Sequence, residues 1–291
     1  MMNLLVAAGA ALTLALPSQQ QRVDTTLAVR QGASLTVDAR QGSVSVSTWD
    51  RDAVRVVAAI GRGGRSARGP AVEVRGSPGA VRVGTAGHAH NTRVDYQLFV
   101  PRWIDLRVDA QNASVQIDGV EGEVAVGTVQ GAVQVRGGRN YVGVTSVGGS
   151  IQIAGVRGRV EAETVNQGIR VSDVRGDVSV ETTNGGIVLE GVTGSSVRAE
   201  TVNGGIRYQG SLADGGFYRF ASHNGSVIVT VPGPPDARVS VMTYNGNFES
   251  EFPLQLTSMQ QSRTFNFTIG TGSARLEMES FNGTVRLVRQ Q

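Results

Sequence analysis

The chain has 291 residues, no cysteine, and 27 basic residues, all arginine, against 24 acidic residues, for a formal charge of +3. The lack of cysteine excludes a disulfide framework. A charge this small, spread along the chain, produces a weak electrostatic field, so we expect no nucleic-acid partner.

The N-terminal segment has the composition of a secretory signal. Leu4 to Leu16 form one apolar run, which Pro17 ends. The run is shorter than the roughly 20 apolar residues that a comfortable membrane span needs. We therefore expect residues 1–18 to be a signal peptide cleaved near Ser18. The mature chain is then exported, to the periplasm or the cell surface, with no transmembrane segment. A short buried strand is the alternative.

Residues 19–110 contain strand-like runs without fixed spacing, such as SLTVDA and VDYQLFV, and a Gly/Arg-rich loop, GRGGRSARGP. A stack of repeats needs protected ends, because an open edge offers unpaired backbone groups to other chains. We expect residues 19–110 to form an N-terminal β cap.

The sequence repeats every 18 residues from Ser114 onward, in units such as SIQIAGVRGRVEAETVNQ. Later units, up to Gly246, are slightly longer. Alternation of apolar and polar residues predicts strands, and a short fixed period predicts a solenoid. The predicted fold is all-β: a single-stranded parallel β-solenoid with coils of about 18 residues over 111–246, capped by irregular β segments at both ends.

Two columns of apolar residues result when the units are aligned, and we expect them to face each other across one narrow core. One column contains Val115, Val133, Ile151, Ile169, Ile187 and Ile206, and the other contains Val124, Val142, Val160, Val178 and Val197. Antiparallel hairpins are the alternative, since Asn-Gly also favours the type I′ hairpin turn.

Turn residues form columns of their own. Asn166, Asn184 and Asn203 align, and Asn224, Asn245 and Asn282 end later units in the same Asn-Gly form. Stacked asparagines can hydrogen-bond along the axis, because neighbouring coils lie about 4.8 Å apart. At the other corner, Gly122, Asn140, Gly158, Gly176 and Gly194 are residues that tolerate a positive φ. We interpret both columns as structural corners.

Residues 247–291 carry an inserted segment and a last unit, ARLEMESFNGTVRLV. We expect a C-terminal β closure there, so that residues 19–291 form one continuous domain.

Three outward columns are candidates for facing a ligand. Glu163, Glu181 and Glu200 form an acidic column, and Arg139, Arg157 and Arg175 form a basic column. Regularly spaced guanidinium groups can follow a polymer of phosphates or uronates. Gln116, Gln134 and Gln152 form the third column. The alternative for the acidic and basic columns is a solvated surface. The alternative for the glutamines is that their amides pair with one another along the axis.

Groups for nucleophilic or metal catalysis are scarce. The histidines are His88, His90 and His223, and His88 and His90 have no third metal ligand nearby in the sequence. We expect no catalytic residue, no metal and no cofactor.

Three stretches resemble a known family, the bacterial putative-adhesin proteins of β-strand repeats, which are related to toast-rack folds. They are QGSVSVSTWDRDAVRV, VDYQLFVPRWIDLRVDAQNASVQI and the closing FTIGTGSARLEMESFNGTVRLV. The resemblance covers nearly the whole mature chain. It implies an exported envelope protein with a β-solenoid-like body and no established catalytic site.

The sequence therefore predicts a non-enzymatic envelope protein, an adhesin-like binding or scaffold module, whose partner is an envelope polysaccharide or an envelope protein. One alternative is an accessory factor of an envelope-stress system that acts through a protein partner. A secreted polysaccharide-active enzyme is the third candidate.

Overall fold

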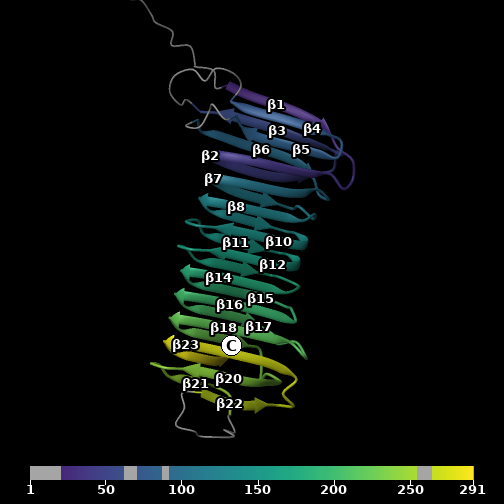
Figure 1. Ribbon diagram of the computed structural model, residues 1–291. Coiled ribbons are helices and arrows are strands. Elements are labelled where there is room, and N and C mark those ends of the chain that lie inside the picture. The colour runs from purple at the N-terminus through teal and green to yellow at the C-terminus, as the bar shows by residue number, and fades with distance from the viewer. Residues whose placement is uncertain (1–20, 62–70, 87–91, 254–263, 291) are drawn as a thin grey trace, which may run out of the picture.

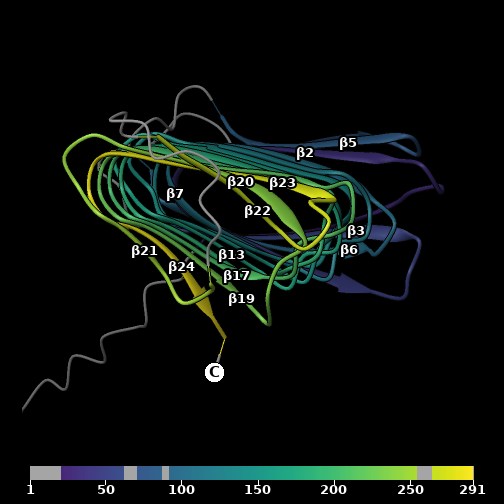
Figure 2. The same cartoon turned by 90° about the horizontal axis from the view of Figure 1, so that it is seen from below.

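The repeats are coils of one continuously winding chain, stacked along the long axis of an elongated body in the computed structural model (Figure 1). The structure describes residues 21–61, 71–86, 92–253 and 264–290, and every regular element in these ranges is a strand. Seen along the axis, the coils superpose as a flattened outline with two long walls (Figure 2). Residues 1–18, the expected signal peptide, and nearly all of the Gly/Arg-rich loop lie outside the described residues.

Each central coil contributes one strand to each wall, and every strand pairs in parallel with strands two elements away. We call the walls A and B. Wall A contains β8 (Val124–Gln130), β10 (Arg139–Ser146), β12 (Arg157–Thr164), β14 (Val178–Asn184), β16 (Ser196–Asn203) and β18 (Phe217–Asn224). Wall B contains β9 (Val133–Arg136), β11 (Ile151–Ala154), β13 (Ile169–Ser172), β15 (Ile187–Val192), β17 (Ile206–Gly210) and β19 (Val227–Val231).

The core consists of the two predicted apolar columns. Ile151 of β11 and Ile169 of β13 are register partners and are 0% and 1% exposed. Val160 of β12 is partnered with Val178 of β14 in the same way on wall A, and both are buried. The parallel β-solenoid is confirmed, and the antiparallel hairpin alternative is wrong for these coils.

The N-terminal end is built out of chain order. Its strands are β1 (Gln21–Ala28), β2 (Ser34–Trp49), β3 (Ala53–Ile60), β4 (Val72–Ser77), β5 (Ala80–Thr85), β6 (Val94–Pro101) and β7 (Asp105–Asp118). The long strand β2 pairs in parallel with β7 on one side and with β5 and β6 on the other. It is therefore a complete coil between two coils that follow it in sequence. Antiparallel pairings of β4 with β5, β3 with β6, and β1 with β3 close this end.

The C-terminal end repeats this arrangement. Its strands are β20 (Ala237–Thr243), β21 (Phe248–Ser250), β22 (Thr264–Ile269), β23 (Ala274–Asn282) and β24 (Val285–Arg289). The last coil of the chain, β23 and β24, pairs in parallel with β18 and β19 on one side and with β20 and β21 on the other. Strand β22 covers β20 in antiparallel pairing.

Coils in register with the repeats thus also include residues outside 111–246 of the sequence. Val37 of β2 is partnered with Val108 of β7, and Leu276 of β23 with Tyr218 of β18, all buried. The described residues form no helix that is long and apolar enough to cross a membrane.

Candidate functional site

The outer surface of wall A carries an almost continuous acidic column. Side chains of a strand alternate between core and solvent, so the residue after each buried Val or Ala of wall A faces outward. In spatial order, the column runs Asp38, Asp109, Gly127, Thr145, Glu163, Glu181, Glu200, Ala221, Glu279. The predicted Glu163, Glu181 and Glu200 are three consecutive members of it.

Small residues in this column and the adjacent outward column hollow the surface of wall A. A hollow of about 370 Å³ lies over Gly127 and Gly143, and one of about 260 Å³ lies over Ala221. A third, of about 650 Å³, lies toward the N-terminal end and shares Asp109, Gly127 and Thr145 with the first. Glu181 lines both the first hollow and the one over Ala221. The hollows therefore follow one another along the column, and we call this strip the acidic trough.

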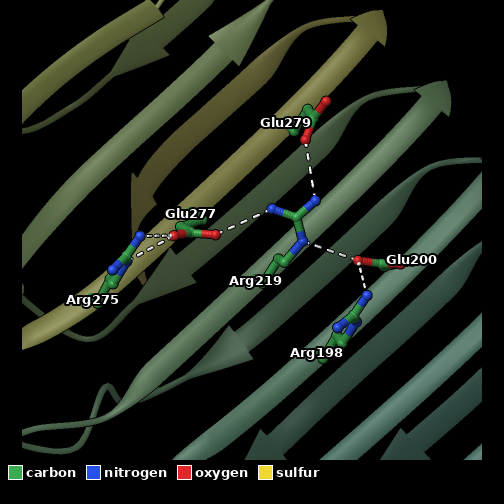
Figure 3. Close-up of polar contacts among 6 residues, drawn as sticks. All are labelled: Arg198, Glu200, Arg219, Arg275, Glu277 and Glu279. Atoms are coloured by element: carbon green, nitrogen blue, oxygen red, sulfur yellow. Dashed lines mark hydrogen bonds and ion pairs between the residues drawn. The ribbon is translucent and has the colours of Figure 1, made fainter.

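An ion network closes the C-terminal part of the trough (Figure 3). The Arg219 guanidinium donates to Glu200 at 3.0 Å, to Glu277 at 3.1 Å and to Glu279 at 3.3 Å. Partial burial acts to raise the pKa of Glu200, but hydrogen bonds from Arg198 and Arg219 outweigh it and hold the pKa below its ordinary value. Because Arg219 lies on β18 and two of its carboxylates lie on β23, the network fastens the last coil of the chain to its neighbour.

Glu163 and Glu181 differ from Glu200, because no arginine among the described residues pairs with them. Both side chains are exposed, and they are register partners on β12 and β14. Neighbouring carboxylates at this spacing repel each other. The middle of the trough therefore has negative charge that no described arginine pairs with.

The predicted arginine row lies at the opposite corner of wall A. Arg139 is partnered with Arg157, and Arg157 forms a bridge to Arg175, so the three follow one another coil by coil. Arg139 pairs with Glu121 at 3.6 Å. Arg157 and Arg175 are exposed and have no ion-pair partner among the described residues. The row and the middle of the trough thus carry unpaired charges of opposite sign on two edges of one wall.

The asparagine corner is a hydrogen-bonded ladder. From the second asparagine onward in the spatial order given below, each Nδ2 donates to the Oδ1 of the preceding asparagine, at distances of 2.8 to 3.2 Å. In spatial order the ladder runs Asn166, Asn184, Asn203, Asn224, Asn282, Asn245. The last two are reversed relative to the sequence, because β23 lies between β18 and β20.

Buried hydroxyls complete the same corner. Thr182 and Thr201 lie two residues before Asn184 and Asn203 and are nearly inaccessible. Thr201 Oγ1 donates to the carbonyl oxygen of Gly185 at 2.9 Å, and Thr182 Oγ1 donates to that of Gln167 at 2.8 Å. A buried hydroxyl without a partner would cost free energy, so these bonds explain why the repeat keeps Thr-x-Asn-Gly.

The opposite corner uses glycine for two reasons. Gly158 and Gly176 have φ values of 142° and 145°, and Asn140 has a φ of 64°, so positive φ is required there. Gly122 and Gly194 are not at positive φ, but a Cβ on either would collide with a carbonyl oxygen of the neighbouring coil, that of Ile104 or that of Gly176.

Sequence reasoning missed an apolar edge beside the trough. It consists of the residue before each turn position, and we define it as Val129, Val147, Val165, Val202, Phe281 and Tyr244. These side chains are 36% to 48% exposed. Thr183 and His223 occupy the same position in the two remaining coils. The signal was present in the sequence, because Val165, Val202, Phe281 and Tyr244 each precede an asparagine of the ladder.

The residues considered for catalysis or metal binding are spread over the structure. The described residues include no group of three or more Asp, Glu, His or Cys side chains that could hold a metal ion. His223 stacks on Phe281, with ring centroids 4.7 Å apart. His88 and His90 lie outside the described residues. Gln116, Gln134 and Gln152 do form a column on wall B, which continues into Arg170.

The arrangement defines the class of protein: a parallel two-walled β-solenoid whose surface carries ladders of repeated side chains. Residues 12–288 match the model of the Toastrack DUF4097 family, and the chain belongs to that family. No curated protein matches the chain.

Two solved structures are similar to the chain over most of its length. One is described as a putative cell adhesion protein from Clostridium sporogenes, with 8% identity, a TM-score of 0.23, and coverage of 93% of this chain and 100% of that one. The other is described as a putative adhesin from Bacteroides fragilis, with 9% identity, a TM-score of 0.36, and coverage of 92% and 98%.

Proposed function

We propose that the protein is an exported, non-enzymatic, adhesin-like binding module of the cell envelope, located in the periplasm or at the cell surface. The observation that carries this proposal is the repetition of exposed charged side chains at one per coil along a regular body. Such a surface can bind a repeating polymer at many equivalent points, each of them weak.

The arginine row is the proposed contact for an anionic polymer. Arg157 and Arg175 have no ion-pair partner among the described residues, so their guanidinium groups are available for a ligand. Guanidinium groups bind phosphate and carboxylate in bidentate geometry, and coils recur about every 4.8 Å. An acidic envelope polysaccharide is the class of polymer that fits.

The acidic column argues against a glycan-cleaving enzyme. Glycosidases hold two carboxyl groups on opposite sides of the bond that they cleave. Glu163 and Glu181 are exposed neighbours on one face of one sheet. They therefore lie on one side of any glycan that rests on wall A.

Binding can be tested with the mature chain on a polygalacturonate surface and on phosphatidylglycerol vesicles, at low and high salt. We expect retention on polygalacturonate at low salt, and a loss of about tenfold or more in the variant R139Q/R157Q/R175Q, because phosphate- and carboxylate-binding cations dominate such affinity.

The matched control is R170Q/R207Q/R286Q. It removes the same number of positive charges from wall B. There Val188 lies between Arg170 and Arg207, and Ile228 lies between Arg207 and Arg286, so these arginines form no continuous row. Equal losses in both variants, or no retention of the unmodified chain at low salt, would contradict binding by the row. Retention on vesicles alone would assign the row to lipid phosphate.

Export has its own test. Protein recovered from cells should begin between Gln19 and Val23. An intact Met1 in a cytoplasmic fraction would contradict both the location and the adhesin-like role.

A further inference from the structure

The apolar edge is an unusual surface for a chain that buries its other apolar columns. It presents one exposed side chain per coil over five successive coils, Val129, Val147, Val165, Thr183 and Val202, and continues into stacked rings. With coils about 4.8 Å apart, the five-coil part is about 19 Å long. An exposed strip of this kind, apolar at every coil but that of Thr183, is typical of an interaction surface.

Strand addition does not fit this edge, because its backbone is already engaged. Gly148 N donates to Val129 O, Asn166 N to Val147 O, and Asn184 N to Val165 O, at 2.7 to 3.0 Å. An added strand needs free backbone donors and acceptors. A partner must therefore bind through side chains.

Charge differs on the two flanks of the edge. Two residues before Val165, Thr183 and Val202 come Glu163, Glu181 and Glu200 of the trough. On the other flank stand the ladder asparagines, whose amides bond to one another. A complementary partner has an apolar line with cations along one side of it and uncharged groups along the other.

We propose that the apolar edge and the middle of the trough bind a cationic amphipathic α-helix of a partner protein, lying parallel to the long axis. The spacing favours a helix. One helical turn rises about 5.4 Å, close to the coil spacing, whereas same-face residues of a strand recur at about 6.6 Å. The proposal rests on the binding role proposed above and specifies a protein partner for a second surface.

A second copy of the chain fits less well. In one twofold arrangement, acidic columns face each other, and in the other the acidic column faces the asparagine corner. Neither places a cation against Glu163 and Glu181. A helix with a basic flank compensates both carboxylates.

The probe is a synthetic helix of about 18 residues, roughly 27 Å long, with leucines in one line and lysines beside it. Binding to the mature chain is measured by fluorescence anisotropy at low and moderate salt. A peptide of the same composition, with its leucines and lysines mixed around the whole circumference of the helix so that no face is apolar, is the control peptide.

The decisive variant is V147T/V165T/V202T. It places at three coils the residue that the chain itself carries at Thr183, so the fold is retained. We expect binding to weaken at least tenfold. In E163Q/E181Q we expect weaker binding with a smaller dependence on salt, and in R170Q/R207Q/R286Q unchanged binding.

Equal binding of the two peptides, or full binding by the threonine variant, overturns the proposal. The oligomeric state is measured by sedimentation. If the unmodified chain is a dimer and the threonine variant is a monomer, a second copy of the chain occupies the apolar edge, and the proposal is overturned. Retention on polygalacturonate tests the arginine row and is measured separately. A negative result with the helix peptides would therefore leave the proposed polysaccharide binding untouched.

Discussion

Asn282 donates a hydrogen bond of 2.8 Å from its Nδ2 to the Oδ1 of Asn224, a residue 58 positions earlier in the chain. The bond exists because the last coil lies directly on β18 and β19. The ladder therefore joins segments that are distant in sequence, as well as adjacent repeats.

The ladder predicts a modest, position-specific effect of Asn203→Asp. The aspartate can still accept the hydrogen bond from Asn224 Nδ2, but it cannot donate one to Asn184 Oδ1. Instead, a carboxylate oxygen faces the Asn184 Oδ1 atom. We expect a loss of about 1 kcal/mol in the free energy of unfolding, measured in urea. Asn247→Asp, at an exposed position outside the ladder, is the control. Equal effects would mean that the ladder contributes little.

Ile169→Asp tests the core. Ile169 is 1% exposed between Ile151 and Ile187, so the substitution puts an unpaired charge in the core. We expect destabilisation on the order of 3 kcal/mol or more, seen as a lower thermal midpoint. Gln152→Asp, on the exposed face of the same wall, should change the midpoint little. A midpoint close to that of the unmodified chain in Ile169→Asp would contradict burial.

Gly149→Ala tests the close approach of successive coils. A Cβ at Gly149 would collide with the carbonyl oxygen of Gly131 in the neighbouring coil, and a backbone atom cannot move aside freely. We expect a loss of about 2 kcal/mol or more. Gly233→Ala is the matched control, because nothing lies within 4 Å of a Cβ there. Similar unfolding curves for the two variants would show that the coils can separate without cost.

Arg219→Gln tests the ion network through its pH dependence. The folded-state pKa of Glu200 is lowered, so the stabilisation is present above the ordinary glutamate pKa of about 4.5 and is lost as the pH falls through the lower folded value. We expect Arg219→Gln to cost about 1 to 2 kcal/mol at neutral pH and to lessen the loss of stability on acidification.

The control for this prediction is Arg75→Gln, which removes an exposed ion pair with Glu73 that does not involve Glu200. Unfolding is followed in urea from neutral pH to below pH 4. A parallel pH profile for Arg219→Gln and the unmodified chain would contradict the assignment of this stability to Arg219.

The sequence predicted the strand register of the central coils correctly, because residues that are one repeat apart become register partners when the repeat length is fixed. Val133, Ile151 and Ile169 are partners at intervals of 18 residues, as predicted. The Asn-Gly turns were recognised as structural corners for the same reason, because they recur once per repeat. Periodicity also placed Glu163 beside Glu181 and Arg139 beside Arg157.

The end coils were not predicted, because their partners lie at irregular separations. Ser34 of β2 is partnered with Asp105 of β7, 71 residues later. The likeness of LTVDARQGSVSVS to LRVDAQNASVQID marks this pairing, but it does not show that β2 lies between two later coils. The ion pairs of Arg219 with Glu277 and Glu279 exist because β23 lies beside β18. They could not be predicted from the sequence for the same reason.

The β2 coil and the β23–β24 coil each lie between coils that are distant in sequence, so only the stack between β7 and β18 follows simple chain order. An extra unit of the repeat inserted there would leave both closures intact and lengthen the body by about 4.8 Å. The length of the body is then set by the number of repeats. That number fixes the distance between whatever is attached at one end and whatever is attached at the other, in equal steps.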